Sequence, residues 1–211
     1  MSDSADRTHY FVEQPEVPSE PRVIEAEVRG HRLSFVTDRG VFSYGKVDAG
    51  SRLLAEQTEL DGAGEVLDWG CAWGLIGVVA ARTWPDLHVV MVDINERACE
   101  LARQNLQRNR VEAEVIAGDA REVLGDRRFD AVVCNPPISA GRAAVIAVFE
   151  HAAELLHPGG SFWMVAATRK GAKTLQRELE ARFAEVERIA MRGGFRVYRA
   201  ADPIIREDDG E

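Results

Sequence analysis

Residues 66–74 read Val-Leu-Asp-Trp-Gly-Cys-Ala-Trp-Gly, and the apolar run Leu-Ile-Gly-Val-Val-Ala-Ala follows at 75–81. An apolar run that ends in an acidic residue, a turn of small residues and a second apolar run together predict a strand, a tight loop and a helix. Gly70 and Gly74 have no Cβ, so the backbone can turn sharply there and lie close to a ligand. This unit is the usual seat of a nucleotide-like ligand in an open α/β sheet. Taken alone, it is equally compatible with a purely structural turn.

Strand-like and helix-like segments alternate after this loop. Seven short apolar runs are predicted strands: Val66–Trp69, His88–Val92, Glu114–Ala117, Ala131–Cys134, Ser161–Ala166 (after a turn at Pro158-Gly159-Gly160), Val186–Met191 and Phe195–Ala200. Helical patterns are predicted from Asn95 to about Asn109, from about Ala143 to Leu156, and on a face made by Leu175, Leu179 and Phe183. Repeated β–α units imply a parallel sheet with helices on both faces. The last two strands are separated only by Arg192-Gly193-Gly194, too short for a parallel crossover, so we expect them to be antiparallel.

The predicted fold class is therefore α/β: a Rossmann-like, seven-stranded, mostly parallel sheet with an antiparallel last strand, helices on both faces and a small N-terminal β-hairpin. The hairpin is predicted at Val23–Val28 and Leu33–Thr37. The segment Gly40–Gly50 mixes glycine, aromatic and charged residues, and it is either a lid over a ligand or an ordinary connector. A helix with apolar positions at Leu53, Leu54 and Leu60 is expected next.

The length of 211 residues favours one domain. We expect a single domain over residues 1–211, in which 1–21 are an extended lead-in and 22–50 form the hairpin and the lid-like segment. Residues 51–201 form the Rossmann-like core, and 202–211 form an acidic tail.

Composition and charge exclude several classes of protein. No apolar run approaches the roughly 20 residues of a membrane helix, and the polar start Met1-Ser2-Asp3-Ser4 is not typical of a signal peptide. The cysteines at 71, 99 and 134 have no paired spacing and the five histidines are scattered, so we expect no disulfide, no metal site and a cytoplasmic location. The net charge of −9 argues against binding nucleic acid through overall positive charge. A local basic face would suffice, for which the sequence offers Arg103, Arg108, Arg110, Arg142, Arg169, Lys170 and Lys173.

Four polar residues follow four predicted strands at the point where each strand ends: Asp68, Asp93, Asp119 and Asn135. Ligands of parallel sheets bind outside the carboxyl ends of the strands, so these side chains are expected on one rim. Asp93 follows Asp68 by 25 residues (93 − 68), near the distance at which an acidic residue binds a ribose diol in dinucleotide folds. The alternative for Asp93 is a helix-start residue beside Asn95. Asp119 could accept a hydrogen bond from an adenine amino group, or simply occupy a turn.

Asn135-Pro136-Pro137-Ile138 is the most informative tetrapeptide. Proline fixes φ and removes a backbone donor, so the segment is stiff and is expected to present bare carbonyls. The Asn135 amide oxygen and the Pro136 carbonyl would make two acceptors in fixed positions. They could hold a planar NH₂ group and orient its lone pair towards an electrophile. A structural turn with two prolines is the alternative.

These residues, in this order and spacing, resemble the class I S-adenosylmethionine-dependent methyltransferases. The segment 35–51, Phe-Val-Thr-Asp-Arg-Gly-Val-Phe-Ser-Tyr-Gly-Lys-Val-Asp-Ala-Gly-Ser, with His9-Tyr10-Phe11 before it, is similar more narrowly to the catalytic domain of the ribosomal RNA small subunit methyltransferase C family. That family methylates the exocyclic N2 amine of a guanine in 16S ribosomal RNA. The resemblance extends from about His9 to Ala200.

The resemblance implies a role for each matching residue. It implies S-adenosyl-L-methionine as cofactor, bound by Lys46, Asp48, Asp68, Gly70, Cys71, Ala72, Gly74, Asp93, Ile94, Asp119, Ala120 and Asn135. It implies catalysis by Asn135, Pro136, Pro137 and Ile138, without a metal. The implied partner is ribosomal RNA or the small ribosomal subunit; the oligomeric state, monomer or homodimer, stays open.

The sequence departs from the family pattern at three points. Ala72 replaces the middle glycine of the loop, which its methyl group tolerates if φ stays negative. Ile138 stands where many relatives carry an aromatic residue that stacks on the target base, so Phe42, Tyr44 and Trp73 are considered as replacements. No second, RNA-binding methyltransferase domain is expected, so docking would need an assembled ribonucleoprotein or a partner.

Three alternatives to this function stay open. The first is methylation of another RNA or DNA amine or of a protein glutamine. The second is a non-catalytic cofactor-binding interaction module, and the third is a nicotinamide dehydrogenase.

Overall fold

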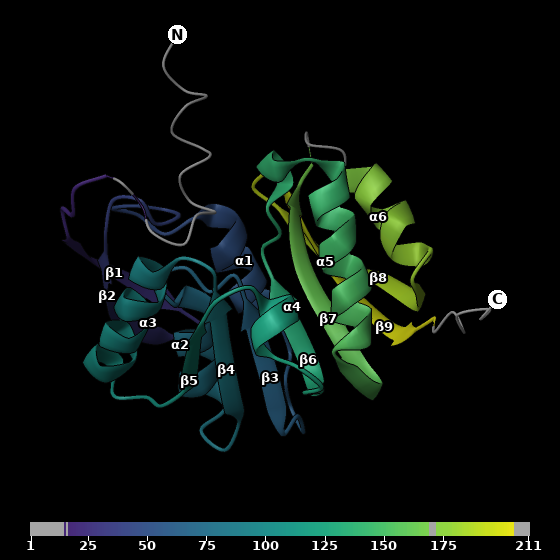
Figure 1. Ribbon diagram of the computed structural model, residues 1–211, viewed down its shortest axis with the longest axis horizontal. Coiled ribbons are helices and arrows are strands. Elements are labelled where there is room, and N and C mark those ends of the chain that lie inside the picture. Colours follow the sequence, from purple (N-terminus) through teal and green to yellow (C-terminus); the bar gives the residue numbers. More distant parts are fainter. Residues whose placement is uncertain (1–14, 16, 169–171, 205–211) are drawn as a thin grey trace, which may run out of the picture.

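Seven strands form one twisted sheet in the order β5-β4-β3-β6-β7-β9-β8 (Figure 1). The computed structural model describes residues 15, 17–168 and 172–204. The strands of this sheet are β3 (Glu65–Trp69), β4 (His88–Asp93), β5 (Glu114–Ala117), β6 (Phe129–Cys134), β7 (Leu156–Ala167), β8 (Phe183–Arg192) and β9 (Phe195–Pro203). Five neighbouring strands of the sheet, β5, β4, β3, β6 and β7, are parallel to one another. Strand β9 lies between β7 and β8 and is antiparallel to both. The expected fold class is confirmed, including the antiparallel pair around Arg192-Gly193-Gly194.

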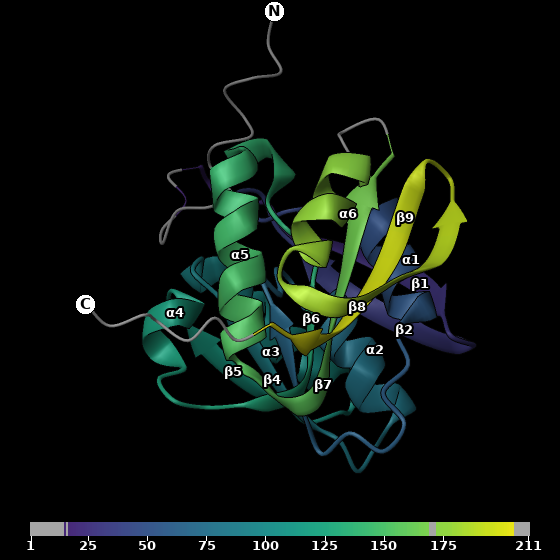
Figure 2. The ribbon, with the colours of Figure 1, turned by 90° about the vertical axis from the view of Figure 1, so that its right-hand side faces the viewer.

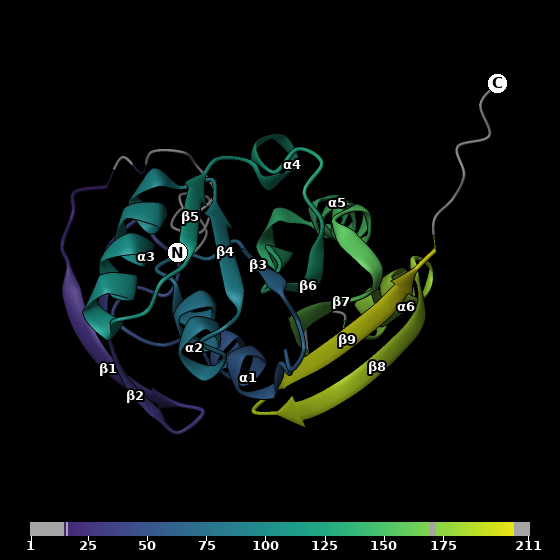
Figure 3. The same cartoon turned by 90° about the horizontal axis from the view of Figure 1, so that it is seen from below.

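Helices cover both faces of the sheet (Figures 2 and 3). One face carries α1 (Ala49–Gln57), α2 (Leu75–Thr83) and α3 (Glu96–Asn109); the other carries the short α4 (Ala120–Val123), α5 (Arg142–Glu154) and α6 (Ala172–Glu180). The sheet therefore separates two apolar clusters, because successive side chains of a strand point to opposite faces. Val66 packs with the first group of helices, whereas its neighbour Leu67 packs with the second. Both faces of the central strands are apolar because helices cover both.

The N-terminal hairpin consists of β1 (Arg22–Val28) and β2 (His31–Thr37), and it forms a separate two-stranded antiparallel sheet. Buried polar side chains of α3 attach it to the core. Asn105, which is fully buried, accepts a hydrogen bond from the Val36 N–H at 2.7 Å. Its Nδ2 donates to the Val36 carbonyl at 2.9 Å and to the Trp73 carbonyl at 2.7 Å. One side chain therefore joins the hairpin, α3 and the glycine loop.

Several predicted boundaries are wrong, each for a tertiary reason. Helix α1 ends at Gln57, and Leu60 lies beyond it but is still buried, so its apolar character reflects burial rather than helical periodicity. Phe183 starts β8 instead of ending the helical face of α6, and it too is buried. The Pro158-Gly159-Gly160 turn is absorbed into β7, where the pairing with β6 skips from Leu156 to Ser161. An irregular strand tolerates this sequence because Pro158 lies in the unpaired stretch.

Two further helices have no counterpart in the prediction. They are α4 and the single 3₁₀ turn η2 (Ile138–Ala140), each too short to show a periodic pattern. Residues 1–14 and 16 of the extended lead-in (1–21) and residues 205–211 of the acidic tail (202–211) lie outside the described residues, and the first two residues of the predicted tail belong to β9. The division into domains stays a prediction. Within the described ranges, no helix is long and apolar enough to cross a membrane.

We predict that Asn105→Ala lowers the free energy of unfolding by about 3 kcal/mol. The substitution leaves buried backbone groups of Val36 and Trp73 unpaired, at roughly 1–3 kcal/mol for each unsatisfied group. Urea denaturation followed by circular dichroism measures the change. Gln104→Ala, at the exposed neighbouring position of the same helix, is the matched control and should stay within about 0.5 kcal/mol of the parent. Equal midpoints for the two variants would contradict the role of Asn105.

Candidate active site

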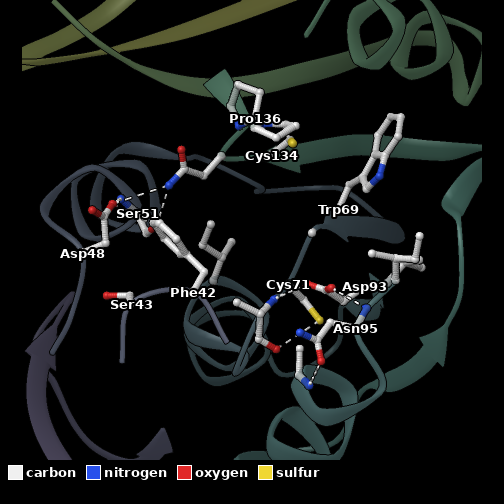
Figure 4. A pocket seen from close by; sticks show the side chains of 18 of the residues that line it. Phe42, Ser43, Asp48, Ser51, Trp69, Cys71, Asp93, Asn95, Cys134 and Pro136 are labelled. Atoms are coloured by element: carbon white, nitrogen blue, oxygen red, sulfur yellow. Dashed lines mark hydrogen bonds between the residues drawn. The ribbon is translucent and has the colours of Figure 1, made fainter. Parts of the chain in front are cut away.

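A cavity of about 880 Å³ lies at the carboxyl ends of β3, β4, β6 and β7. The segment 41–51 and residues of the α5 region close its sides, and Figure 4 shows Asp48 and Ser51 on one side and Asp93 and Asn95 on the other. Most of the predicted site residues line it: Lys46, Asp48, Gly70, Cys71, Ala72, Asp93, Ile94, Asp119, Ala120, Asn135, Pro136, Pro137 and Ile138. Asp68 and Gly74 do not line it; they lie behind the loop.

The glycine loop is built from left-handed backbone. Gly70 has φ +75°, Ala72 +49° and Gly74 +94°. The condition under which the Ala72 methyl group would be tolerated easily, a negative φ, is therefore not met. Left-handed geometry costs a non-glycine residue roughly 1–2 kcal/mol, and the loop geometry is maintained by the end of β4. The N–H groups of Gly70 and Cys71 donate to the Val92 carbonyl, and that of Ala72 donates to Asp93 Oδ2 at 2.8 Å.

Gly74 is needed for space as well as for its backbone angle. A Cβ at this position would lie 2.9 Å from Met91 Cε and 3.3 Å from the Ala102 Cα. The loop, β4 and α3 meet here too closely for any side chain. Gly74 therefore affects the cavity indirectly, because it determines where α2 begins.

Asp68 is buried beneath the loop. Its Oδ2 accepts a hydrogen bond from the Gly77 N–H at 2.8 Å, and within the described part of the chain its buried Oδ1 has no partner. Burial raises the pKa of Asp68 to about 7, with a smaller contribution from the nearby Asp93 carboxylate. An acceptor without a donor next to a ligand cavity is a place where a bound cationic group would be stabilised.

Asp93 faces the cavity at the end of β4 and is half-buried. Besides the Ala72 N–H, it accepts the Asn95 N–H at 2.9 Å, and burial raises its pKa to about 6. Asn95 itself caps α3, accepting the Ala98 N–H. The role of helix-start residue therefore belongs to Asn95. Asp93 connects the loop to the cavity and keeps acceptor capacity for a diol.

Asp119 lies at the start of α4. It caps α4 by accepting the Arg121 N–H, and its carboxylate forms an ion pair with the Arg121 side chain that lowers its pKa. Ala120 and Gly118 line the cavity beside it. A donor in the cavity would share the Asp119 carboxylate with Arg121.

The Asn-Pro-Pro-Ile segment leaves β6 and enters η2. The sequence predicted proline carbonyls without hydrogen-bond donors, and this prediction is wrong. The Pro136 carbonyl accepts the Ile138 N–H at 2.8 Å and the Pro137 carbonyl accepts the Ala140 N–H at 2.9 Å. Pro137, at φ −75° and ψ 70°, makes an inverse γ-turn that brings these groups together. A carbonyl oxygen has two lone pairs, so the Pro136 carbonyl keeps one acceptor site.

Asn135 is held by the start of α1. Its Nδ2 donates to Ser51 Oγ at 2.8 Å and lies 3.5 Å from Asp48 Oδ2. Asp48 in turn caps α1 by accepting the Ser51 N–H at 2.8 Å. Within the described residues, no donor contacts Asn135 Oδ1. Ser51 was not predicted from the sequence, because a serine in the first turn of a helix has no distinguishing pattern.

The three aromatic residues considered as base-stacking groups differ in position. Trp73 is 2% exposed and packs against Phe35 with ring centroids 5.0 Å apart, so it belongs to the core. Tyr44 lies under the Arg22 guanidinium, 4.8 Å from the ring centroid. Phe42 is 39% exposed; all three residues contribute to the cavity lining, and Phe42 is the most exposed of them. Phe195 and Trp69 also line the cavity and were missed, because both read as ordinary strand residues.

Among the described residues, no group of three or more histidine, cysteine, aspartate or glutamate side chains could hold a metal ion.

Comparison with known proteins decides the family. The model of the methyltransferase small domain matches residues 32–199, which is most of the chain and includes the whole cavity. The chain belongs to the methyltransferase small domain family. The family and the shared fold confirm the expected class, an S-adenosyl-L-methionine-dependent methyltransferase.

Relatives of this small-domain methyltransferase differ in length. The uncharacterized protein YbxB of Bacillus subtilis is 36% identical over 197 residues, which cover 91% of this chain and 97% of YbxB. Ribosomal RNA small subunit methyltransferase C of Stutzerimonas stutzeri is 36% identical over 172 residues, covering 80% of this chain and 51% of the relative. The chain thus spans about half the length of that relative.

A solved structure shares the fold of this small-domain methyltransferase closely. The 16S rRNA N2 methyltransferase of T. thermophilus, determined in complex with AdoMet and guanosine, superimposes with a TM-score of 0.77 at 30% identity. The match covers 89% of this chain and 52% of the other.

The cavity of this methyltransferase fits the cofactor that the family implies. The Gly70 position is open, because a Cβ placed there would have no other atom within 4 Å, so a ligand can approach the backbone. Asp93 lines the cavity and keeps acceptor capacity for a sugar diol. The individual roles of these residues stay predictions.

We predict that the cofactor-free methyltransferase loses stability as pH rises from about 4 to about 7. In this window the unfolded chain has released the Asp68 proton, whose ordinary pKa is 3.8, while the folded protein retains it up to about pH 7. The folded state then binds more protons, so stability falls with pH. The difference converts to roughly 4 kcal/mol at most.

Thermal and urea unfolding between pH 4 and 8 measure this dependence. Asp68→Asn should reduce this dependence, leaving the part due to Asp93, whose pKa burial also raises, and should raise the stability at pH 8 relative to the parent protein. Asp86→Asn, at an exposed position, is the control and should leave the slope unchanged. A slope that is the same in the parent and in Asp68→Asn would exclude Asp68 as its source.

Proposed function

We propose that this methyltransferase transfers a methyl group to an exocyclic amine, the N2 of guanine in 16S ribosomal RNA, in the cytoplasm. The observation that carries the proposal is the state of Asn135: its NH₂ group is engaged by Ser51, and its oxygen is left to accept a hydrogen bond in the cavity. The names of the relatives support the choice of substrate, since several are ribosomal RNA small subunit methyltransferase C and one is a 16S rRNA N2 methyltransferase.

Two acceptors would hold the target amine. The Asn135 oxygen and the second lone pair of the Pro136 carbonyl each accept one N–H of an NH₂ group. A planar NH₂ bound in this way directs its lone pair out of the plane of its own N–H bonds. As the amine nitrogen gains positive charge during transfer, both oxygens would stabilise it.

The cofactor would supply an electrophilic methyl group on a sulfonium. As the N–C bond forms, the S–C bond would break and the cofactor would leave as a neutral thioether, and the methylated amine would release one N–H proton to solvent. We propose that the loop residues Gly70, Cys71 and Ala72, with Asp68 and Gly74 behind them, hold its methionine part. Asp93 and Ile94 would bind the ribose, and Asp119 and Ala120 the adenine. Lys46 is exposed on the segment that covers the cavity and would act at the entrance.

An RNA target needs a docking surface. The net charge of −9 opposes long-range attraction to RNA. Several of the basic residues considered from the sequence are already engaged: Arg103 donates to the Val115 carbonyl, Arg108 to Ser34 and Arg142 to Glu178. Arg169 and Lys170 lie outside the described residues, as does the Lys173 side chain. We therefore propose an assembled small ribosomal subunit, rather than naked RNA, as the substrate.

Phe42 is proposed to supply the stacking surface that Ile138 does not. It lines the same cavity as Asn135 and is 39% exposed, whereas Trp73 is occupied in the core. A planar base whose amine reaches Asn135 would then have an aromatic ring beside it.

Asn135→Ala should reduce methyl transfer by at least about a hundredfold while S-adenosyl-L-methionine still binds, because the substitution removes an acceptor for the amine and not a main contact of the cofactor. Radiolabelled methyl transfer to isolated small ribosomal subunits, naked 16S RNA and protein extract measures the first quantity, and calorimetry measures the second. Loss of both together would show that Asn135 serves the cofactor. Label only in protein would favour a glutamine substrate, and label in no fraction would contradict the proposed function.

Phe42→Ala should raise the KM for the ribosomal substrate about tenfold or more, since base–aromatic stacking contributes roughly 1–3 kcal/mol. Phe42→Tyr keeps the ring and should behave like the parent protein. The KM for S-adenosyl-L-methionine should change little in either variant. An unchanged substrate KM in Phe42→Ala would remove this residue from the base site.

A further inference from the structure

We propose that Ser51 and Asp48 are positioning residues that fix which way the Asn135 amide faces. This inference rests on the proposed function, because it concerns how the acceptor for the target amine is oriented. It also gives Asp48 a different task from the cofactor contact that the family resemblance implies.

The three side chains form one directional chain of hydrogen bonds. Asn135 Nδ2 donates to Ser51 Oγ at 2.8 Å, and Ser51 Oγ donates to Asp48 Oδ2 at 3.2 Å. Asn135 Nδ2 also lies 3.5 Å from the same carboxylate oxygen. Figure 4 shows Asp48 and Ser51 adjacent at this side of the cavity, with dashed lines for these contacts.

The Asp48 carboxylate fixes the direction of these hydrogen bonds. Ionised aspartate only accepts hydrogen bonds, so the Ser51 hydroxyl directs its single proton to Asp48 and offers a lone pair to Asn135. If the Asn135 amide were rotated by 180°, its oxygen would lie about 3.5 Å from the Asp48 carboxylate oxygen and would compete with it for the single Ser51 hydroxyl proton. That orientation is disfavoured by electrostatic repulsion, so the NH₂ group faces Ser51 and the oxygen faces away from it.

The fixed orientation matters because an asparagine amide can present either a donor or an acceptor. A substrate NH₂ group requires the acceptor, and an amide free to rotate would present the wrong atom part of the time. The hydrogen-bond chain also polarises the amide towards its oxygen, which strengthens that acceptor. Both effects grow as the amine becomes positive, so they favour turnover more than substrate binding.

The start of α1 is itself held firmly. Asp48 caps the helix through the Ser51 N–H, and Ser51 is 8% exposed. Gly50, between them, lies so close to Phe195 of β9 that a Cβ would be 2.9 Å from the ring. The first turn of α1 is thus pressed against the sheet, which places the Ser51 hydroxyl beside the end of β6.

The test is a double-mutant cycle on kcat with small ribosomal subunits as substrate. Ser51→Ala should lower kcat about tenfold, with the KM of S-adenosyl-L-methionine and the melting temperature little changed. In the Asn135→Ala background, the same substitution should have no further effect on kcat, because Ser51 acts through Asn135. A loss of the same size in both backgrounds would overturn the proposal.

Two further variants define the expected role. Ser51→Thr keeps the hydroxyl and should restore most of the activity. Ser34→Ala removes a serine hydroxyl that accepts from Arg108 on the hairpin, far from the cavity, and should leave kcat unchanged.

A measurement without turnover separates this inference from the proposed function. In ¹⁵N-resolved NMR spectra, the Asn135 side-chain NH₂ protons, identified by their loss in Asn135→Ala, should exchange with water at least tenfold faster in Ser51→Ala than in the parent. Unchanged exchange would overturn the positioning role even if the enzyme is active. Absence of methyl transfer to every substrate, with faster exchange in Ser51→Ala, would contradict the proposed function but support the orientation of Asn135.

Discussion

The cavity depends on three hydrogen bonds that join the Gly70–Gly74 loop to the end of β4. The Val92 carbonyl accepts the N–H groups of Gly70 and Cys71, and the Asp93 carboxylate accepts that of Ala72. These bonds hold the loop in left-handed backbone even at Ala72, whose methyl group makes that geometry unfavourable. The same arrangement brings two carboxylates, Asp68 and Asp93, under and beside the loop. Burial there raises the pKa of both, so the cavity is prepared for a ligand at some cost to the stability of the empty protein.

The opposite wall of the cavity is assembled from parts of the chain that are distant in sequence. Asn135 follows β6, whereas Asp48 and Ser51 begin α1, more than eighty residues earlier. Phe195 of β9 contacts the first turn of α1 from a third position. The antiparallel insertion of β9 beside β7 is what places that ring next to the cavity. The side of the cavity at Asn135 therefore depends on the complete sheet, while the side at the glycine loop depends mainly on β3, β4 and their loops.

The N-terminal hairpin is held to this frame by polar side chains as well as by apolar packing. Asn105 connects Val36 with Trp73, and Asn95 donates to the Gly40 carbonyl at 2.8 Å. Asn105 lies in α3 and Asn95 caps its first turn, and α3 packs against the loop at Gly74. The segment that covers the cavity is thus attached to the same helix that shapes the glycine loop. This connection explains how residues 41–51 can be both outside the central sheet and part of the site.

The sequence by itself determined the order of strands and helices, the antiparallel final pair and the rim of polar residues, because these follow from periodicity, link length and strand ends. It also indicated the family through the loop and Asn135-Pro136-Pro137-Ile138. Only the tertiary structure decided what depends on contacts between distant segments. Leu60 and Phe183 are buried without helical periodicity, Ala72 is forced to a positive φ by β4, and the Pro136 carbonyl is already bonded through a γ-turn. Ser51 belongs to the site only because folding places α1 against the end of β6, and no local pattern encodes that proximity.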